Sequence, residues 1–382
     1  MIPWVSSFGV KFLLWPERAS AASRAINVDN FGAVGDGIAN DRGALTRALA
    51  AWQIQGGRLE FTPGKTYWLG SVDRESDMFL IPQLPPGAAL IGNGATLVVG
   101  VSGLKTRLFL FRFHLFEGLL IEGLNIQGIG GDSRINWQGT YFCTLDGALP
   151  GRALNFSLRN VEVRDCVAML YVGGGIIRVS GITIHSCSAI RCYYGLVFHE
   201  NGDEVEAAFS AIDCRRAYFP YGVNYHRVSI DVAHGSTFPG ANACILIKRY
   251  TLDTRDIVVT ANFKGPEFPW KSAVKLELQN DASAAIEGVT IDAVVCDPPR
   301  QLAMAALSFS DLSSEGVPYR GREKHEFSGI AFSCRGFPTS SLLVENETPQ
   351  CAQATVTVDP AQIREGRVGP AVNLVAMSAR SG

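Results

Sequence analysis

The chain has little charge of either sign. Only 18% of its 382 residues are Asp, Glu, Lys or Arg, and its formal net charge is −2. A chain with so little net charge offers no basic footprint for a phosphate backbone, so we expect no nucleic-acid partner. Hydrophobic residues make up 47% of the chain, which excludes a disordered protein and is enough for a large core.

The sequence also lacks an uninterrupted apolar segment that would form a membrane-spanning helix. Residues 81–104 are sufficient in number, but Pro82, Pro85 and Pro86 interrupt them, so we expect buried strands there and no membrane contact. Residues 1–25 contain an apolar stretch and then a run of small residues, with a single basic residue before the stretch. They are either an extension or the remnant of a poor signal peptide. A secreted or periplasmic location is slightly favoured over a cytoplasmic one.

None of the nine cysteines shows the C-x-x-C spacing of a metal or redox site. Five of them follow alternating apolar runs at a recurring position, and small hydrophobic residues stacked in a core explain this better than zinc or disulfides. We therefore expect no metal and no cofactor. The five are Cys166, Cys187, Cys214, Cys296 and Cys334.

Short alternating strands recur along the chain from about residue 151. A first pattern, which ends in a small polar residue, occurs at 160–166, 181–187, 227–235, 256–265 and 288–296. A second pattern occurs at 152–157, 168–173, 195–200, 244–249, 273–278 and 306–311. A period of about 21 to 32 residues with short strands fits a parallel β-solenoid, because only stacked coils can bury the inward residues. A β-sandwich is the alternative, but hairpin signals between the strands are sparse.

Residues 27–69 form a distinct N-terminal unit. Asn40 or Asp41 offers a capping oxygen for a helix with an apolar stripe that includes Leu45 and Trp52, and the pair Gly56-Gly57 ends it. Laid across the open end of a solenoid, this helix would cover core residues and unpaired strand edges. The glycine-rich turn at 32–37 lacks the ending of a phosphate-binding loop, so we reject that function.

The same segment closely resembles the N-terminal motif of the pectate-lyase-like superfamily. The resemblance implies an all-β, right-handed parallel β-helix with an N-terminal capping α-helix. We expect an extension at 1–26 and a single domain at 27–382, with a cap at 27–70, coils at 71–350 and a C-terminal end at 351–382. The matching residues are Phe31, Gly32, Ala33, Gly35, Asp36, Gly37, Asp41, Ala44, Leu45, Gly56, Gly57, Pro63, Gly64 and Tyr67.

The superfamily includes polygalacturonase-type hydrolases, exo-glucanases, pectate lyases, uronate epimerases and tailspike depolymerases, so the resemblance does not fix a reaction. It implies saccharide binding in a groove beside one sheet. The Asn-x-Asp, Asp-Asp and Gly-His-Gly motifs of the hydrolases are absent, and residues 245–250 match their Arg-Ile-Lys strand at two positions. The compact Asp cluster of calcium-dependent lyases is absent too.

Alternation predicts which side chains of the second pattern face outward on one sheet. The expected outward residues are Asn155, Tyr171, Val197, His199, Leu246, Lys248, Lys275, Glu277, Ser308 and Ser310. Titratable residues concentrate at 199–204 and 248–253, although the first of these segments is also interpretable as a solvated turn. We expect Glu200 and Asp203 as a catalytic carboxylate pair, with His199 beside them. The expected substrate-binding residues are Tyr171, Tyr221, Tyr225, His226, Lys248, Arg249, Asp253, Lys275 and Glu277.

These residues predict a carbohydrate-active enzyme, with a glycoside hydrolase acting on an oligo- or polysaccharide as the first choice. A lyase or uronate epimerase is the alternative, with His199, His226, Lys248 or Arg249 as the base and tyrosines as acids. A non-catalytic glycan-binding module, such as part of a tail fibre, is the alternative of another class. A homo-oligomer, including a trimer, is compatible with each of these.

Overall fold

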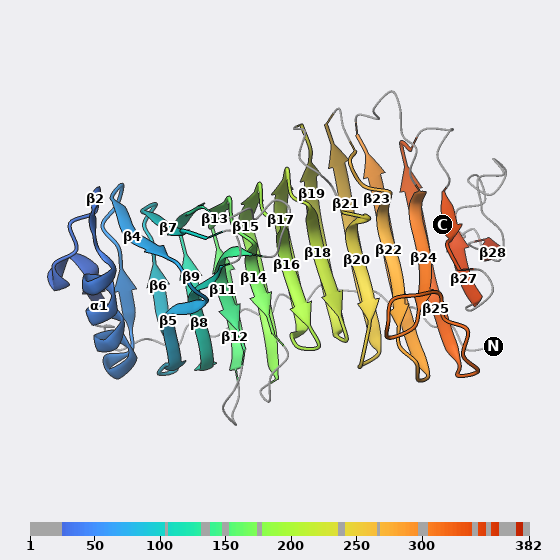
Figure 1. Ribbon diagram of the computed structural model, residues 1–382, viewed down its shortest axis with the longest axis horizontal. Coiled ribbons are helices and arrows are strands. Elements are labelled where there is room, and N and C mark those ends of the chain that lie inside the picture. Colours follow the sequence, from blue (N-terminus) through green and yellow to red (C-terminus); the bar gives the residue numbers. More distant parts are fainter. Residues whose placement is uncertain are drawn as a thin grey trace, which may run out of the picture.

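The chain winds into a stack of short strands, with its α-helix at the N-terminal end of the stack (Figure 1). All pairings between the named strands are parallel, and an isolated bridge between Leu312 and Pro318 is the one antiparallel contact among the described residues. The expected parallel β-helix is therefore confirmed, and the β-sandwich is excluded. The computed structural model describes residues 25–103, 106–130, 138–146, 153–173, 178–235, 241–265, 268–296, 305–337, 343–348, 353–358 and 372–376.

The strands form two long sheets, and from β14 onward each coil contributes one strand to each sheet. Sheet B contains β5 (Ser76–Gln83), β8 (Arg107–Glu117), β11 (Gly139–Leu145), β14 (Ala168–Val172), β16 (Tyr194–His199), β18 (Arg216–Tyr221), β20 (Ala243–Arg249), β22 (Ser272–Gln279), β24 (Ala305–Leu312) and β26 (Val344–Asn346). The early strands of sheet A are β1 (Ala25–Asn27), β2 (Asp36–Asn40), β3 (Arg58–Glu60), β4 (Thr66–Val72), β6 (Ala89–Ile91), β7 (Thr96–Val101), β9 (Leu120–Glu122), β10 (Asn125–Ile129), β12 (Ala153–Arg159) and β13 (Glu162–Arg164). Sheet A continues with β15 (Val179–Ile190), β17 (Asp203–Ile212), β19 (Asn224–Ala233), β21 (Thr254–Lys264), β23 (Ala284–Val295), β25 (His325–Arg335), β27 (Gln353–Val358) and β28 (Val372–Ala376).

The second sequence pattern marks sheet B in five of its six occurrences. The exception is 152–157, which lies in β12 of sheet A, so the expectation that Asn155 faces outward on sheet B is wrong. Its alternation resembles that of the other segments, but β11 supplies the sheet B strand of that coil. The pattern also missed β18, where Pro220 interrupts the sequence signal.

A residue with positive φ recurs where successive coils enter sheet A, just before β9 in one coil and within the first five residues of the sheet A strand in the later ones. These residues are in register from coil to coil, and we call them the corner ladder. Their φ values lie between 55° and 76°, a region that non-glycine residues rarely adopt. The ladder consists of Gly118, Asn155, Gly181, Glu204, Tyr225, Asp256, Gly288 and Gly329.

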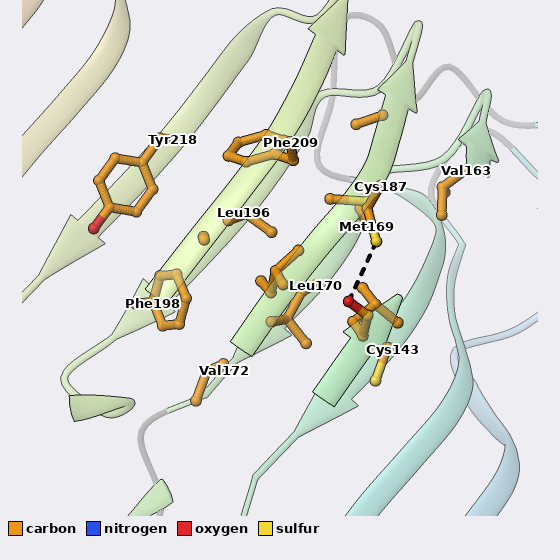
Figure 2. Packing of buried hydrophobic residues seen from close by; sticks show 14 of the residues in the cluster. Cys143, Val163, Met169, Leu170, Val172, Cys187, Leu196, Phe198, Phe209 and Tyr218 are labelled. Atoms are coloured by element: carbon orange, nitrogen blue, oxygen red, sulfur yellow. Dashed lines mark hydrogen bonds between the residues drawn. The ribbon is translucent and has the colours of Figure 1, made fainter. Parts of the chain in front are cut away.

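The core is built from rows of inward side chains, one from each coil. One such row in sheet B is fully buried and continuous from β8 to β26. Figure 2 shows part of it together with Val163, Cys187 and Phe209 of sheet A. The row consists of Phe111, Cys143, Leu170, Leu196, Tyr218, Ile245, Val274, Leu307 and Val344.

Seven described cysteines are buried, as expected of small core residues. The exception is Cys296, which is exposed because it follows the end of β23, so its expected burial is wrong. Cys351 lies outside the described residues.

Helix α1 (Arg42–Gln55) follows a 3₁₀ turn (Val28–Phe31) and buries the predicted apolar stripe at the end of the stack. Asn40 Oδ1 accepts a hydrogen bond from the Arg42 amide at 3.0 Å, as expected of a cap, while the Asp41 carboxylate binds the amides of Val34 and Gly35. Trp52 is fully buried, and its Nε1 donates to the Gly57 carbonyl at 3.0 Å. Residues 81–104 contribute to strands β5 to β7, and no described helix is long and apolar enough to span a bilayer.

Candidate functional site

The side of sheet B that faces away from the core carries two aligned rows of outward side chains. We call this surface the outer face. One row runs through Arg112, Thr144, Tyr171, Val197, Phe219, Leu246, Lys275 and Ser308. The other runs through His199, Tyr221, Lys248, Glu277 and Ser310. The structure thus brings together residues that are more than a hundred positions apart, and apart from Asn155 the predicted outward residues share this face.

The N-terminal half of the outer face is aromatic. Tyr141 lies 4.9 Å from Phe109 and 5.7 Å from Tyr171, measured between ring centroids. Two coils further on, Tyr194 stacks on Phe219 at 5.8 Å. Tyr141 is buried and the other four rings are half-buried, and the parts they leave accessible can pack against the apolar faces of sugar rings.

A charged cluster borders these rings on the N-terminal side. The Arg112 guanidinium holds Asp146 in a bidentate pair, with Nη2 at 2.6 Å and Nε at 2.9 Å, and Nη1 bonds Asp77 at 3.1 Å. The hydrogen bonds to Asp146 raise the pKa of Arg112. Sequence reasoning missed this cluster, because its members come from three coils. The signal available was an arginine in the apolar middle of the strand, LFLFRF within RLFLFRFHLFE.

His199 is the titratable centre of the outer face. Its Nδ1 lies 3.0 Å from the Tyr171 hydroxyl, and its ring lies 4.2 Å from the Tyr221 ring. Burial lowers the pKa of His199, the Lys248 charge lowers it further, and Glu200 partly opposes this. Among the described residues, His199 Nε2 has no hydrogen-bond partner, so a half-buried neutral imidazole presents one nitrogen to the surface.

Burial raises the pKa of both tyrosines beside His199, so their hydroxyls stay protonated at neutral pH. Negative charge adds to the effect, from Asp146 at Tyr171 and from Glu200 at Tyr221. The predicted residues His199, Tyr171 and Tyr221 therefore lie together. At neutral pH the histidine can accept a proton and the tyrosine hydroxyls can donate one.

The C-terminal half of the outer face is a network of lysines and carboxylates. Lys248 Nζ lies 3.0 Å from Glu277, and it also bonds Gln279. Lys275 lies 2.7 Å from Glu347 and 3.7 Å from Glu277. The predicted residues Lys248, Lys275 and Glu277 are thus neighbours, and each charge has an opposite charge beside it. No group of three or more possible metal ligands occurs among the described residues.

Glu200 and Asp203 have separate partners. Glu200 Oε1 accepts the Thr251 amide at 2.8 Å, and its charge acts on His199 and Tyr221. Asp203 accepts the Asn224 amide at 2.9 Å and pairs with Arg178 at 2.6 Å. Glu200 is held toward the outer face, whereas Asp203 is held beside the corner ladder. The catalytic roles of both residues stay predictions.

His226 occupies a core position between Val205 and Ile257 and is fully buried. Its Nε2 donates to the Gly202 carbonyl and its Nδ1 accepts from the Tyr218 hydroxyl, both at 2.5 Å. Burial lowers its pKa to about 4. A histidine enclosed in this way cannot reach a surface ligand. Tyr225 lies in the corner ladder and is 61% exposed.

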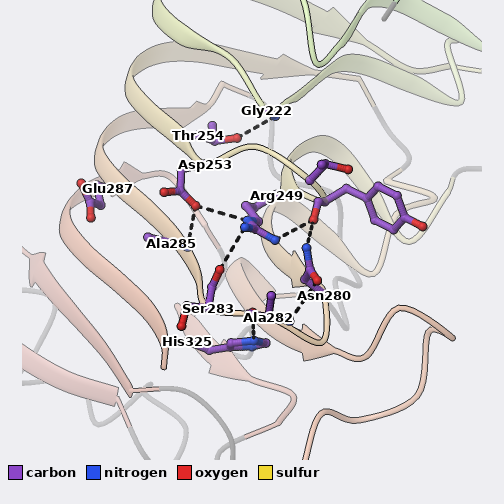
Figure 3. Close-up of polar contacts among 12 residues, drawn as sticks. Gly222, Arg249, Asp253, Thr254, Asn280, Ala282, Ser283, Ala285, Glu287 and His325 are labelled. Atoms are coloured by element: carbon purple, nitrogen blue, oxygen red, sulfur yellow. Dashed lines mark hydrogen bonds and ion pairs between the residues drawn. The ribbon is translucent and has the colours of Figure 1, made fainter. Parts of the chain in front are cut away.

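Arg249 and Asp253 form part of a turn (Figure 3). The Arg249 side chain is buried, and it donates to Asp253 at 3.2 Å, to the Tyr250 carbonyl at 2.6 Å and to the Ser283 carbonyl at 3.0 Å. Asp253 also accepts the Ala285 amide. With these donors engaged, Arg249 joins two successive coils, and its predicted contact with substrate is untested.

Comparison with known proteins finds structural likeness at low sequence identity. No family model and no curated protein matches the chain. Among solved structures, the chain is similar to endo-xylogalacturonan hydrolase from Aspergillus tubingensis, with 11% identity, 94% of this chain and 100% of that chain covered, and a TM-score of 0.47. It is similar to the mannuronan C-5 epimerase AlgE6 A-module of Azotobacter vinelandii, with 15% identity, coverage of 93% and 100%, and a TM-score of 0.48.

A third likeness is to the tailspike protein of E. coli bacteriophage HK620, with 12% identity, coverage of 94% and 81%, and a TM-score of 0.36. The similar structures thus include a hydrolase, an epimerase and a tailspike. No residue role transfers to this chain at these identities.

Proposed function

We propose that the outer face of sheet B binds an acidic polysaccharide and that His199 removes a proton beside a uronate carboxylate. The chain is then a polysaccharide lyase or a uronate epimerase. The observation that supports this most is the neutral imidazole of His199, which Tyr171 holds at Nδ1 while Nε2 stays open to the outer face. Proton abstraction requires such a base in its unprotonated form at neutral pH.

The carboxylates of the outer face fit this reaction better than hydrolysis. A hydrolase needs one carboxylic acid that is protonated and a second carboxylate that is free to act as base or nucleophile. Asp77 and Asp146 are bound by Arg112, and Glu277 lies between two lysines. With these cations beside them, none of the three carboxylates is free to act on a water molecule or a leaving group.

The surrounding residues supply the other parts of the reaction. With the Nδ1–H of His199 donating to the Tyr171 oxygen, the Nε2 lone pair takes the proton from C5 of the uronate. Lys248, adjacent to Tyr221 in the sheet, offers positive charge to the uronate carboxylate. In a lyase, the C4–O bond then breaks, its electron pair leaves with the oxygen, and the electrons of the C5–H bond form the C4–C5 double bond. The Tyr221 hydroxyl gives its proton to the leaving oxygen, whereas in an epimerase it protonates C5 from the opposite face.

The experiment is proton exchange in D₂O with polygalacturonate, alginate and glucuronoxylan. If the chain is an epimerase we expect deuterium at C5, and if it is a lyase we expect the ultraviolet absorbance of an unsaturated uronate, whose C5 carries no hydrogen. His199→Ala and Tyr221→Phe should each lower turnover at least 100-fold with an unchanged melting temperature. His185→Ala, on the outer side of sheet A, is the matched control and should retain activity.

The same histidine gives a readout without substrate. We expect a His199 pKa below the ordinary value of about 6.5 by NMR titration, and we expect Lys248→Met to raise it and Glu200→Gln to lower it further. New reducing ends without C5 exchange or an unsaturated product would indicate hydrolysis and contradict the proposal. Glycan binding without any turnover would contradict the proposed reaction and indicate a glycan-binding module.

A further inference from the structure

Arg216 is an almost buried cation at the edge of the aromatic half of the outer face. It begins β18 and is paired with Tyr194 of β16, and it is 9% exposed. Its guanidinium carbon lies 4.8 Å from the centre of the Phe219 ring and 6.0 Å from that of Tyr194. The two rings are themselves stacked, so the cation lies beside an apolar platform.

Unlike Arg112, this arginine has no anionic partner among the described residues. Its Nη2 donates to Asn242 Oδ1 at 2.8 Å, and its Nε makes a long contact of 3.4 Å with the Ala243 carbonyl. No described carboxylate oxygen lies within 4.0 Å, and Nη1 makes no hydrogen bond to the described part of the chain. Burying an unpaired charge is costly, and desolvation accordingly lowers the pKa of Arg216.

We propose that Arg216 binds an anionic substituent of a saccharide, a carboxylate or a sulfate ester, whose ring lies against Tyr194 and Phe219. A planar guanidinium with an open edge suits a group with two or more oxygens, and a bound anion would supply the missing counter-charge. This inference rests on the proposed function insofar as the ligand lies along the outer face.

The place of Arg216 makes it a positioning residue. Tyr221, beside His199, lies five residues further along β18, which at roughly 3.3 Å per residue is about 16 Å away. Arg216 therefore contacts a different sugar unit from the one at His199. Its loss should raise KM for long acidic substrates and leave kcat unchanged, and it should have no effect on substrates too short to reach both points.

The test is binding to an array of uronate-containing and sulfated glycans and their carboxyl-reduced or desulfated counterparts. We expect the wild type to bind acidic glycans at least tenfold more tightly than the neutral counterparts, with the uronate and sulfate arms identifying the anion. Arg216→Met should lower this preference severalfold while Lys248 keeps the remainder, and Arg216→Lys should restore part of the loss. Arg227→Met, an exposed arginine on β19 of sheet A, removes the same charge and should bind as the wild type does.

Equal weakening of acidic and neutral binding by Arg216→Met would mean that Arg216 only supports the fold, and it would overturn the inference. So would a wild type that shows no preference for acidic glycans. If Arg216→Met is destabilised, the Arg216→Lys variant decides the test. The inference then requires Arg216→Lys to prefer acidic glycans, but less strongly than the wild type does. Since binding is measured separately from turnover, acidic binding through Arg216 with neither C5 exchange nor an unsaturated product would refute proton abstraction alone.

Discussion

Whether a polar residue of this chain faces the surface or the core depends on the row of aligned side chains to which it belongs. His199 and His226 both lie near the ends of alternating strands, yet one faces the surface and the other fills a core position. Sequence alternation predicted the outward direction of His199 correctly. The same alternation places His226 on the inward side with Val228 and Ile230, so its expected contact with substrate ran against the pattern of its own strand.

The buried His226 should make the stability of the fold depend on pH. Its pKa is about 4 in the folded chain and about 6.5 when unfolded, so between these values only the unfolded state binds the proton. The free energy of unfolding is then unaffected above pH 6.5, falls as the pH drops to about 4, and loses about 3 kcal/mol in total. Urea unfolding at pH 7 and pH 4.5 measures this.

His226→Gln is the control, because glutamine keeps a donor and an acceptor but does not titrate. It should be less stable than the wild type at pH 7 and show a correspondingly weaker loss at pH 4.5. Equal losses in both proteins would show that another group causes the pH dependence.

Each coil enters sheet A past one residue of the corner ladder. Glycine, asparagine and aspartate adopt positive φ most readily, and they fill six of the eight positions of the corner ladder. Glu204 and Tyr225 fill the other two. The sequence allowed a solvated turn over 199–204, which includes Glu204, but it predicted no corner at Tyr225.

Substitutions in the corner ladder should therefore have unequal effects. Gly181→Ala should lower the free energy of unfolding by about 1–3 kcal/mol, since φ is 72° and the new Cβ would lie 2.7 Å from Asn155 Oδ1. Tyr225→Gly should change it by less than about 1 kcal/mol, because relief of the positive φ offsets the greater freedom of the unfolded chain. Denaturant unfolding of the two variants measures these free energies. A larger loss of unfolding free energy in Tyr225→Gly than in Gly181→Ala would contradict this account. A loss of glycan binding at unchanged stability would support the predicted contact of Tyr225 with substrate.

At the scale of the whole molecule, the described strands of each coil contact mainly the strands of the neighbouring coils. The sequence could predict this architecture from its repeated strands and its N-terminal helix. It could not predict the pairing of Arg112 with Asp77 and Asp146, or the isolated charge of Arg216. Those depend on side chains that meet from strands 20 to 35 positions apart.

Stability should consequently be a local property along the stack. Trp52→Ala removes a fully buried ring from the N-terminal cap, and Phe309→Ala removes one from β24. Each should cost about 3–5 kcal/mol. In hydrogen exchange, we expect Trp52→Ala to speed exchange in α1 and β1–β4 while β22–β24 keep their protection, and Phe309→Ala to do the reverse. Faster exchange throughout the chain in either variant would show that the stack unfolds as one unit.

The strands beside the corner ladder keep their register although the segments that lead into it differ in length. Residues 200–202 join β16 to β17, whereas residues 313–324 join β24 to β25. A stack with this property can accept extra residues at one edge without moving the strands on either side. Such an edge is where the protein can acquire a new recognition loop, by evolution or by grafting, while the two rows of the outer face stay in place.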